Sequence, residues 1–164
     1  MDIVINKFAS KEEMYKSLIT SFESTVKDVY DLYAILSNAS SVLNLYLDNI
    51  NWVGFYLLKN SKLVLGPFQG KPAVSYIEIG KGVCGSAVKD QETKLVENVH
   101  NFCGHIACDI NSKSEIVVPM YLDNNIFGVL DIDSPIYSRF DKDDQMGLES
   151  FLEVLMIYIK KAEV

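Results

Sequence analysis

The chain has 164 residues, which suits a single hydrophobic core, so we expect one domain over residues 1–164. Hydrophobic residues make up 49% of the sequence, too many for a disordered chain. The formal net charge is −7 and Arg139 is the only arginine, so the clustered basic residues of a nucleic-acid surface are absent and no nucleic-acid partner is expected.

The N-terminus has no basic region followed by an apolar run, and no apolar run approaches the length of a membrane span. We therefore expect neither a signal peptide nor a membrane partner, and we expect a cytoplasmic location. In that compartment an odd number of cysteines does not indicate a disulfide scaffold. The three cysteines are then core residues, metal ligands or reactive thiols.

Two helices are predicted before the first strand. Ser10 and Glu13 have the spacing of a capping box, and apolar residues at helical spacing follow them. A second helix is predicted over about 28–48, where the polar residues 38–41 weaken its middle and could break it.

The middle of the chain predicts strands joined by turns. Asn60-Ser61 and the run 123–125 are turn formers between apolar runs, and 66–72 reads as a loop. A short helix is expected over 83–89, and a long loop over 101–114. The predicted strands cover residues 52–58, 62–65, 75–79, 95–99, 116–122 and 126–132.

Asp141 can cap a last helix that carries an apolar stripe. Because neighbouring strands are joined by tight turns, we expect an antiparallel sheet with the N- and C-terminal helices packed on one face. This is an α+β arrangement, and a pocket closed by the long loops is expected on the other face.

The cysteines differ in their predicted surroundings. Cys84 follows Lys81 at the start of a predicted helix, and both the lysine and the helix N-terminus favour a thiolate. Cys108 lies in the polar loop 101–114, where a core cysteine would be out of place. Spacing alone leaves open both a reactive pair and inert buried cysteines.

A metal site on the same loop is an alternative. His100, Cys103, His105 and Cys108 are candidate ligands within the nine residues 100–108. Structural zinc sites usually draw ligand pairs from separated segments, and four ligands on one short loop would strain the geometry. The pattern therefore favours thiol chemistry, and we expect no metal and no cofactor.

Asp131 and Asp133 alternate with Leu130 and Ile132, so both carboxylates point to one face of a predicted strand. If that face lines a pocket, the two charges need a cation or a shared proton, and Glu115 on the neighbouring strand could join them. The pattern by itself slightly favours the alternative, in which the aspartates face solvent and the apolar residues face the core.

Trp52, Phe55 and Tyr56 lie on the first predicted strand. Aromatic residues at such positions are usually core residues, but one face of the strand could instead hold a ligand methyl group.

Six blocks of sequence occur in one order over nearly the whole chain. They are NWVGFY (51–56), GPFQGKP (66–72), GVCG (82–85), GHIACD (104–109), SEIVVP (114–119) and LDIDSP (130–135). Together they resemble the free methionine-(R)-sulfoxide reductases, which are stand-alone GAF domains. The resemblance implies a GAF fold with an antiparallel sheet, and a homodimer built from the terminal helices.

The resemblance also implies roles for the cysteines. Cys108 corresponds to the nucleophile of the family, and Cys84 to a cysteine of its intramolecular disulfide, so Cys84 is the expected resolving residue. Many members carry a further cysteine where this chain has Val74. Cys103 stands where the family usually has proline, and it is the alternative resolving residue.

The implied substrate is free L-methionine (R)-S-oxide. The family's substrate-binding acids correspond to Glu115, Asp131 and Asp133, and its aromatic box to Trp52 and Tyr56. The implied reaction passes through a cysteine sulfenic acid and a disulfide, and thioredoxin or a similar dithiol recycles the enzyme. The competing hypothesis is a non-catalytic GAF module that senses a small ligand, although such modules are normally fused to an output domain.

Overall fold

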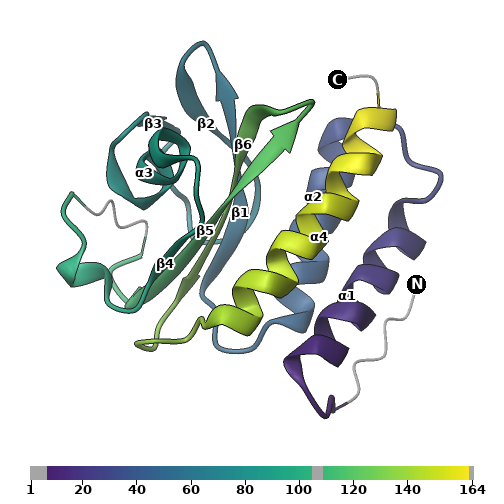
Figure 1. Cartoon of the computed structure of the whole chain (residues 1–164), viewed down its shortest axis with the longest axis horizontal. Coiled ribbons are helices and arrows are strands. Elements are labelled where there is room, and N and C mark those ends of the chain that lie inside the picture. Colours follow the sequence, from purple (N-terminus) through teal and green to yellow (C-terminus); the bar gives the residue numbers. More distant parts are fainter. Residues whose placement is uncertain (1–6, 105–108, 163–164) are drawn as a thin grey trace.

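The computed structural model describes residues 7–104 and 109–162. These residues form a six-stranded antiparallel sheet, with α2 and α4 packed on one face, α1 packed against those two helices, and α3 lying on the other face (Figure 1). The elements in chain order are α1 (Lys11–Val26), α2 (Leu32–Tyr46), β1 (Trp52–Lys59), β2 (Lys62–Gly70), β3 (Tyr76–Glu78), α3 (Gly82–Asp90), β4 (Lys94–Val96), the 3-10 turn η1 (Val99–Asn101), β5 (Ser114–Leu122), β6 (Asn125–Ser134) and α4 (Lys142–Lys161). The expected α+β architecture is confirmed. No helix in the two described ranges combines the length and the apolar character needed to cross a bilayer.

The strand order across the sheet is β3-β2-β1-β6-β5-β4, so the hairpins β1–β2 and β5–β6 meet along β1 and β6. Both hairpin turns have the backbone that their residues predicted. Asn60 and Ser61 have φ of 50° and 61°, and Asp123 and Asn124 have φ of 49° and 66°. Positive φ at both central residues is what a tight hairpin with the native twist requires.

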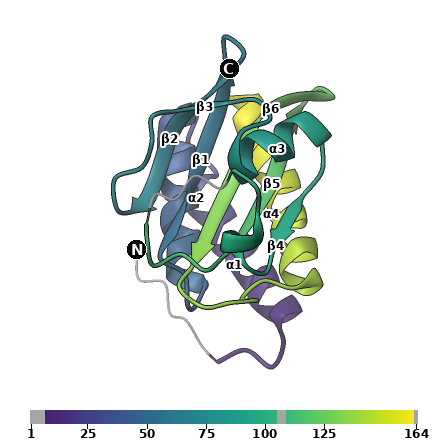
Figure 2. The same cartoon turned by 90° about the vertical axis from the view of Figure 1, so that its left-hand side faces the viewer.

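The central strands β1, β5 and β6 alternate between two buried faces. On β6, Leu130 and Ile132 belong to the large core under the three helices, whereas Val129 belongs to the smaller core under α3. Figure 2 shows α3 in front of the β5–β6 part of the sheet, and α3 contacts both strands. Where α3 packs on β5 and β6, the sheet therefore has no open face. Side chains on both faces of these two strands are covered there.

Three predicted boundaries were wrong, and one of them is the end of the strand predicted over 95–99, which ends at Val96. The second helix begins at Leu32, because Asp31 caps it by accepting the amide hydrogen of Ala34 at 2.8 Å. It runs unbroken through 38–41, where Ser40 Oγ donates to the carbonyl oxygen of Ser37. Strand β2 continues to Gly70, through the predicted loop, because the segment is paired along one edge only and its proline needs no partner on the other.

The terminal helices are joined by a buried carboxylate. Asp144 is 0% exposed and accepts hydrogen bonds from Lys11 Nζ (2.6 Å), Tyr15 Oη (2.8 Å) and an Arg139 guanidinium nitrogen (3.2 Å). Asp144 also completes the capping box that the predicted cap Asp141 opens at the start of α4. The network ties α1 to α4, so the helical layer is anchored by charge as well as by apolar packing.

Candidate active site

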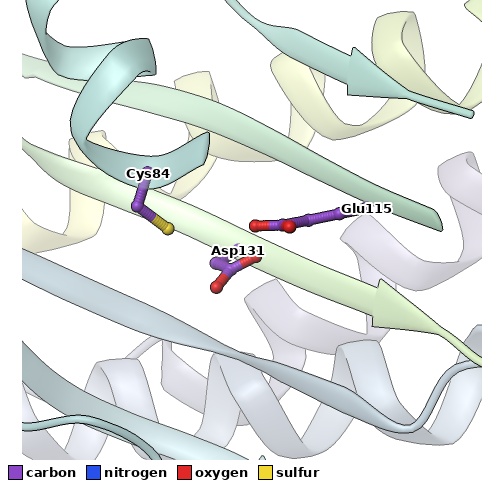
Figure 3. A group of neighbouring side chains, drawn as sticks. All are labelled: Cys84, Glu115 and Asp131. Carbon is purple, nitrogen blue, oxygen red and sulfur yellow. The ribbon is translucent and has the colours of Figure 1, made fainter. Parts of the chain in front are cut away.

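Three carboxylates and one thiol meet between α3 and the sheet. Glu115 and Asp133 are strand partners on β5 and β6, and Asp131 lies two residues before Asp133, on the same face of β6. The Cys84 sulfur and one carboxylate oxygen each of Glu115 and Asp131 all lie within 4.8 Å of one another (Figure 3). All four side chains are buried, with exposed fractions of 3–6%. The structure thus brings the predicted acids together with the predicted resolving cysteine.

The position of Cys84 follows from the glycines around it. Gly82 opens α3 with φ of +60°, a conformation that glycine adopts without strain. A Cβ on Gly85 would lie 2.3 Å from the carbonyl oxygen of Glu78, so only glycine lets the first turn of α3 approach β3 this closely. Cys84 therefore lies in the first turn of α3, against the acidic residues of β5 and β6.

Burial is the largest influence on the acids. It raises the pKa of Glu115, Asp131 and Asp133 well above the usual carboxyl range. Repulsion among the carboxylates is the next cause: the charge of Asp133 acts on Glu115, that of Glu115 on Asp131, and that of Asp131 on Asp133. The cluster therefore retains protons that exposed carboxyls would lose, which suits a group that must donate one.

The structure does not favour the Cys84 thiolate that Lys81 and the helix N-terminus suggested. Burial raises the pKa of its thiol well above the usual value, and the charges of Asp131 and Glu115 raise it further. The helix N-terminus and Lys81 were the sequence features that favoured ionisation. They are outweighed because the thiol is buried beside carboxylates that lie far from it in the sequence.

The solvent-facing alternative for Asp131 and Asp133 was also wrong. The alternation with Leu130 and Ile132 was correct, since those two residues are 0% exposed in the helical core. The face opposite the core is covered by α3, and the aspartates are 5% and 6% exposed there. A polar strand face indicates solvent only where nothing packs on it.

Aromatic residues flank the acids on β1. Trp52 is the strand partner of Asp133, and its ring lies 6.0 Å from the Tyr56 ring and 5.2 Å from the Phe68 ring, stacked on both. The indole Nε1 donates to the carbonyl oxygen of Lys71 at 3.1 Å. The sequence did not single out Phe68, because its segment was predicted as a loop. Pairing of Phe68 with Gly54 on β1 is what places it here.

Tyr56, on the same strand as Trp52, also forms a hydrogen bond with the segment after β2. The Tyr56 hydroxyl donates to the carbonyl oxygen of Val74 at 2.8 Å, so Trp52 and Tyr56 together fasten the segment that follows β2. Phe55 points the other way and belongs to the helical core, as aromatic residues on strands usually do.

A small cavity lies at the centre of the cluster. Its volume is about 10 Å³, room for roughly one water molecule. Its lining includes Tyr56, Lys81, Cys84 and the three acids. The lining is therefore rich in negative charge and suits a cation.

The long loop contributes less to the described structure. Cys108 and His105 lie outside the described residues. Cys103 is an exposed free thiol, and His100 is exposed, with its ring 6.5 Å from that of Tyr137. The candidate metal-ligand groups in the described ranges do not include His100 or Cys103.

Asp109, within the long loop, is a buried residue that its sequence pattern did not single out. It accepts hydrogen from the Asn111 amide at 2.9 Å and forms an ion pair with Lys71 at 3.0 Å. The Asn111 amide and then the lysine lower the pKa of this carboxyl. Asp109 stays ionised, in contrast to the crowded acids beside Cys84.

This fold, a six-stranded antiparallel sheet with a covered pocket, is that of a GAF domain, and the GAF domain family model matches residues 18–159. The chain is 47% identical over 146 residues to the free methionine-R-sulfoxide reductase of Escherichia coli, which covers 89% of this chain and 88% of that protein. It is 43% identical over 155 residues to the protein of the same name from Saccharomyces cerevisiae, which covers 89% of this chain and 86% of that protein.

Solved structures agree. The fRMsr of Staphylococcus aureus in complex with substrate is 51% identical, with a TM-score of 0.85 over 96% of this chain and 99% of that one. The free methionine-R-sulfoxide reductase of Neisseria meningitidis in complex with its substrate is 36% identical, with a TM-score of 0.93 over 99% of this chain and 98% of that one. The chain belongs to the free methionine-R-sulfoxide reductase family of GAF domains.

Proposed function

We propose that this protein is an enzyme that reduces free L-methionine (R)-S-oxide to L-methionine, and that it works as one GAF domain over residues 1–164 in the cytoplasm. The observation that carries the proposal is the grouping of a cysteine with buried carboxylates from two strands. It occurs in a chain 47% identical to a reductase of that name. Thiols and proton donors in one pocket are what the reaction needs.

The first step uses the nucleophile Cys108. Its thiolate attacks the sulfoxide sulfur, and the oxygen is transferred to the cysteine as methionine departs, which leaves a sulfenic acid. The oxygen must gain a proton during this step. Glu115, Asp131 and Asp133 have raised pKa values, so a protonated carboxyl of this cluster is the proton donor.

The second step uses Cys84. Its thiol condenses with the sulfenic acid, forming a disulfide and releasing water, and an external dithiol such as thioredoxin then reduces the disulfide. Because Cys84 is buried with a raised pKa, it needs a base to lose its proton. The Asp131 carboxylate lies beside the thiol and can accept that proton.

The same acids explain a preference for the free amino acid. The α-ammonium group of free methionine sulfoxide can neutralise the carboxylate cluster, and Trp52 and Tyr56 provide the apolar wall beside it. A substrate with a blocked amine leaves buried charge uncompensated, at about 3–5 kcal/mol. That corresponds to a discrimination of roughly a hundredfold or more.

The protein is also proposed to form a homodimer through its terminal helices. Met146 and Ile157 on α4 and Tyr33 on α2 are large apolar side chains more than half exposed on the helical layer. Sedimentation equilibrium tests this, and a monomer at all concentrations would contradict it.

The test of the activity is a coupled assay with thioredoxin, thioredoxin reductase and NADPH. We expect turnover with free (R)-sulfoxide, little with free (S)-sulfoxide, and a rate at least about a hundredfold lower with the N-acetylated (R)-sulfoxide. Tight binding of free (R)-sulfoxide without NADPH consumption would instead indicate a sensory GAF module.

Cysteine variants test the roles. Cys108→Ser is expected to abolish reduction with any reductant. Cys84→Ser is expected to release about one methionine per enzyme and then to recycle poorly with thioredoxin. Turnover in Cys108→Ser would remove Cys108 as nucleophile. Full thioredoxin-coupled turnover in Cys84→Ser would transfer the resolving role to Cys103.

A further inference from the structure

One oxygen of the buried cluster has no hydrogen-bond partner among the described residues. Asp131 Oδ1 is buried and accepts no hydrogen bond from any residue within 7–104 and 109–162. Asp131 also lines the cavity of about 10 Å³. Buried polar atoms are normally satisfied, so an acceptor of this kind is a candidate contact for a water, an ion or a ligand. A small space thus adjoins an acceptor to which no residue of the described ranges donates.

We propose that Cys84, Glu115 and Asp131 bind one zinc ion when the protein is reduced. The three ligand atoms lie within 4.8 Å of one another, and each comes from a different element, α3, β5 or β6. Figure 3 shows the sulfur and the two carboxylates converging on one region. The site is distinct from the loop 100–108, where the sequence suggested clustered ligands.

The donor set selects the metal. One sulfur and two carboxylate oxygens suit zinc, whereas magnesium and calcium prefer oxygen ligands alone. Around a tetrahedral zinc ion, bond lengths of about 2.0–2.3 Å place neighbouring ligand atoms about 3.3–3.5 Å apart. The cluster therefore needs to contract by at most about 1.5 Å in any pair, which rotation of two side chains can supply.

The charge of the pocket agrees with this choice. Its lining contains Glu115, Asp131, Asp133 and the Cys84 thiol, and Lys81 is the one basic residue among the described lining residues. A divalent cation offsets the carboxylates that otherwise repel one another. With three protein ligands, the fourth zinc position is left to a water molecule, so the site is an exchangeable one.

A consequence for catalysis rests on the proposed function. Zinc and the α-ammonium group of the substrate would use the same carboxylates, so zinc would inhibit competitively and a chelator would restore activity. A disulfide at Cys84 removes the sulfur ligand, so the oxidised protein would not bind the metal.

The test measures metal binding directly, on the reduced full chain without substrate. Cobalt(II) is expected to bind with one ion per chain and to give a thiolate-to-cobalt charge-transfer absorption that zinc abolishes by displacement. Zinc at a hundredfold excess over its Kd is expected to raise Tm by about 5–10 °C.

Variants locate the site. Cys84→Ser is expected to lose the charge-transfer band and to weaken zinc binding at least about tenfold, since even outer-shell partners have that effect. Asp131→Asn keeps the side-chain shape and is expected to weaken binding similarly while the band persists at saturating cobalt. Cys103→Ser changes the exposed thiol and serves as the control, with unchanged binding.

The proposal is overturned if the reduced protein binds no zinc, if Cys84→Ser and Asp131→Asn bind as the parent does, or if Cys103→Ser loses binding, which would place the metal on the loop 100–108. A chain that binds zinc through Cys84 but reduces no methionine sulfoxide would confirm this site and contradict the proposed function.

Discussion

Asp131→Asn separates what the acidic cluster does for stability from what it does for the substrate. Burial, and then the charge of Glu115, raises the pKa of the Asp131 carboxyl in the folded protein. The folded state therefore holds this proton more tightly than the unfolded chain does. Its contribution to stability is fully present below the unfolded pKa, near 4, and is lost as pH rises toward the folded pKa.

The size of the effect follows from linkage. A carboxyl that is protonated when folded and ionised when unfolded lowers the free energy of unfolding by about 1.4 kcal/mol for each pH unit. In a chain of this length, 1 kcal/mol changes Tm by about 2–4 °C. Between the unfolded and the folded pKa of Asp131, each rise of one pH unit should therefore lower the Tm of the parent protein by about 3–6 °C. The asparagine cannot ionise, so Asp131→Asn should be the more stable protein at neutral pH.

The substrate should respond in the opposite direction. The bound ammonium group favours the ionised form of Asp131, and in the variant it loses this charged partner, which is worth about 1.5–3 kcal/mol. The kcat/KM for free (R)-sulfoxide should therefore fall by roughly 10- to 100-fold. The assays are thermal unfolding between about pH 5 and pH 8 and steady-state kinetics with the thioredoxin couple.

Asp90→Asn is the matched control. Asp90 is an exposed carboxyl whose pKa is lowered by its hydrogen bond with Lys94, so its contribution is present above the unfolded pKa and lost as pH falls. Its replacement should not raise Tm at neutral pH. An Asp131→Asn protein that is less stable than the parent at neutral pH, or whose Tm has the same pH slope, would refute the reasoning.

Two further substitutions test the frame of the site. Gly54→Ala places a Cβ 2.3 Å from the Cβ of Phe68, so the β1–β2 pairing must shift. We expect a loss of about 1–3 kcal/mol in the free energy of unfolding and a raised KM. Unchanged values would show that this contact is not tight. Asp144→Asn removes the only buried carboxylate of the ion network: Arg139 loses its partner Asp144, and Lys11 keeps only the more exposed Asp141. We expect a loss of about 3–5 kcal/mol measured by urea unfolding, with near-parent kcat at low temperature, and a stable variant would show that the ion network contributes little.

Local sequence chemistry was enough to predict most of the frame. The hairpin residues Asn60-Ser61, the helix caps Ser10 and Asp141, and the alternation along β6 each specify a local conformation, and each is observed. One detail of the first cap differs, because the Glu13 carboxylate accepts the amide hydrogen of Ala9 rather than that of Ser10.

The predictions that were wrong concern features that depend on contacts between segments distant in the sequence. Proline and glycines predicted that β2 would end early, but pairing with β1 carries it to Gly70. The burial of Asp131 and the raised pKa of Cys84 depend on where α3 packs, which no local pattern encodes. The resemblance of six blocks to a known family indicated the acidic pocket where the residue pattern alone slightly favoured solvent.

The central claim is that Cys108 accepts the sulfoxide oxygen in the same pocket that contains Cys84 and the acids. Disulfide mapping by mass spectrometry tests it most directly, after the reduced enzyme is treated with excess free (R)-sulfoxide and no reductant. We expect one methionine per chain and a cross-linked peptide pair containing Cys84 and Cys108. Thiols that remain reduced, or a Cys103–Cys108 pair with Cys84 still free, would contradict it.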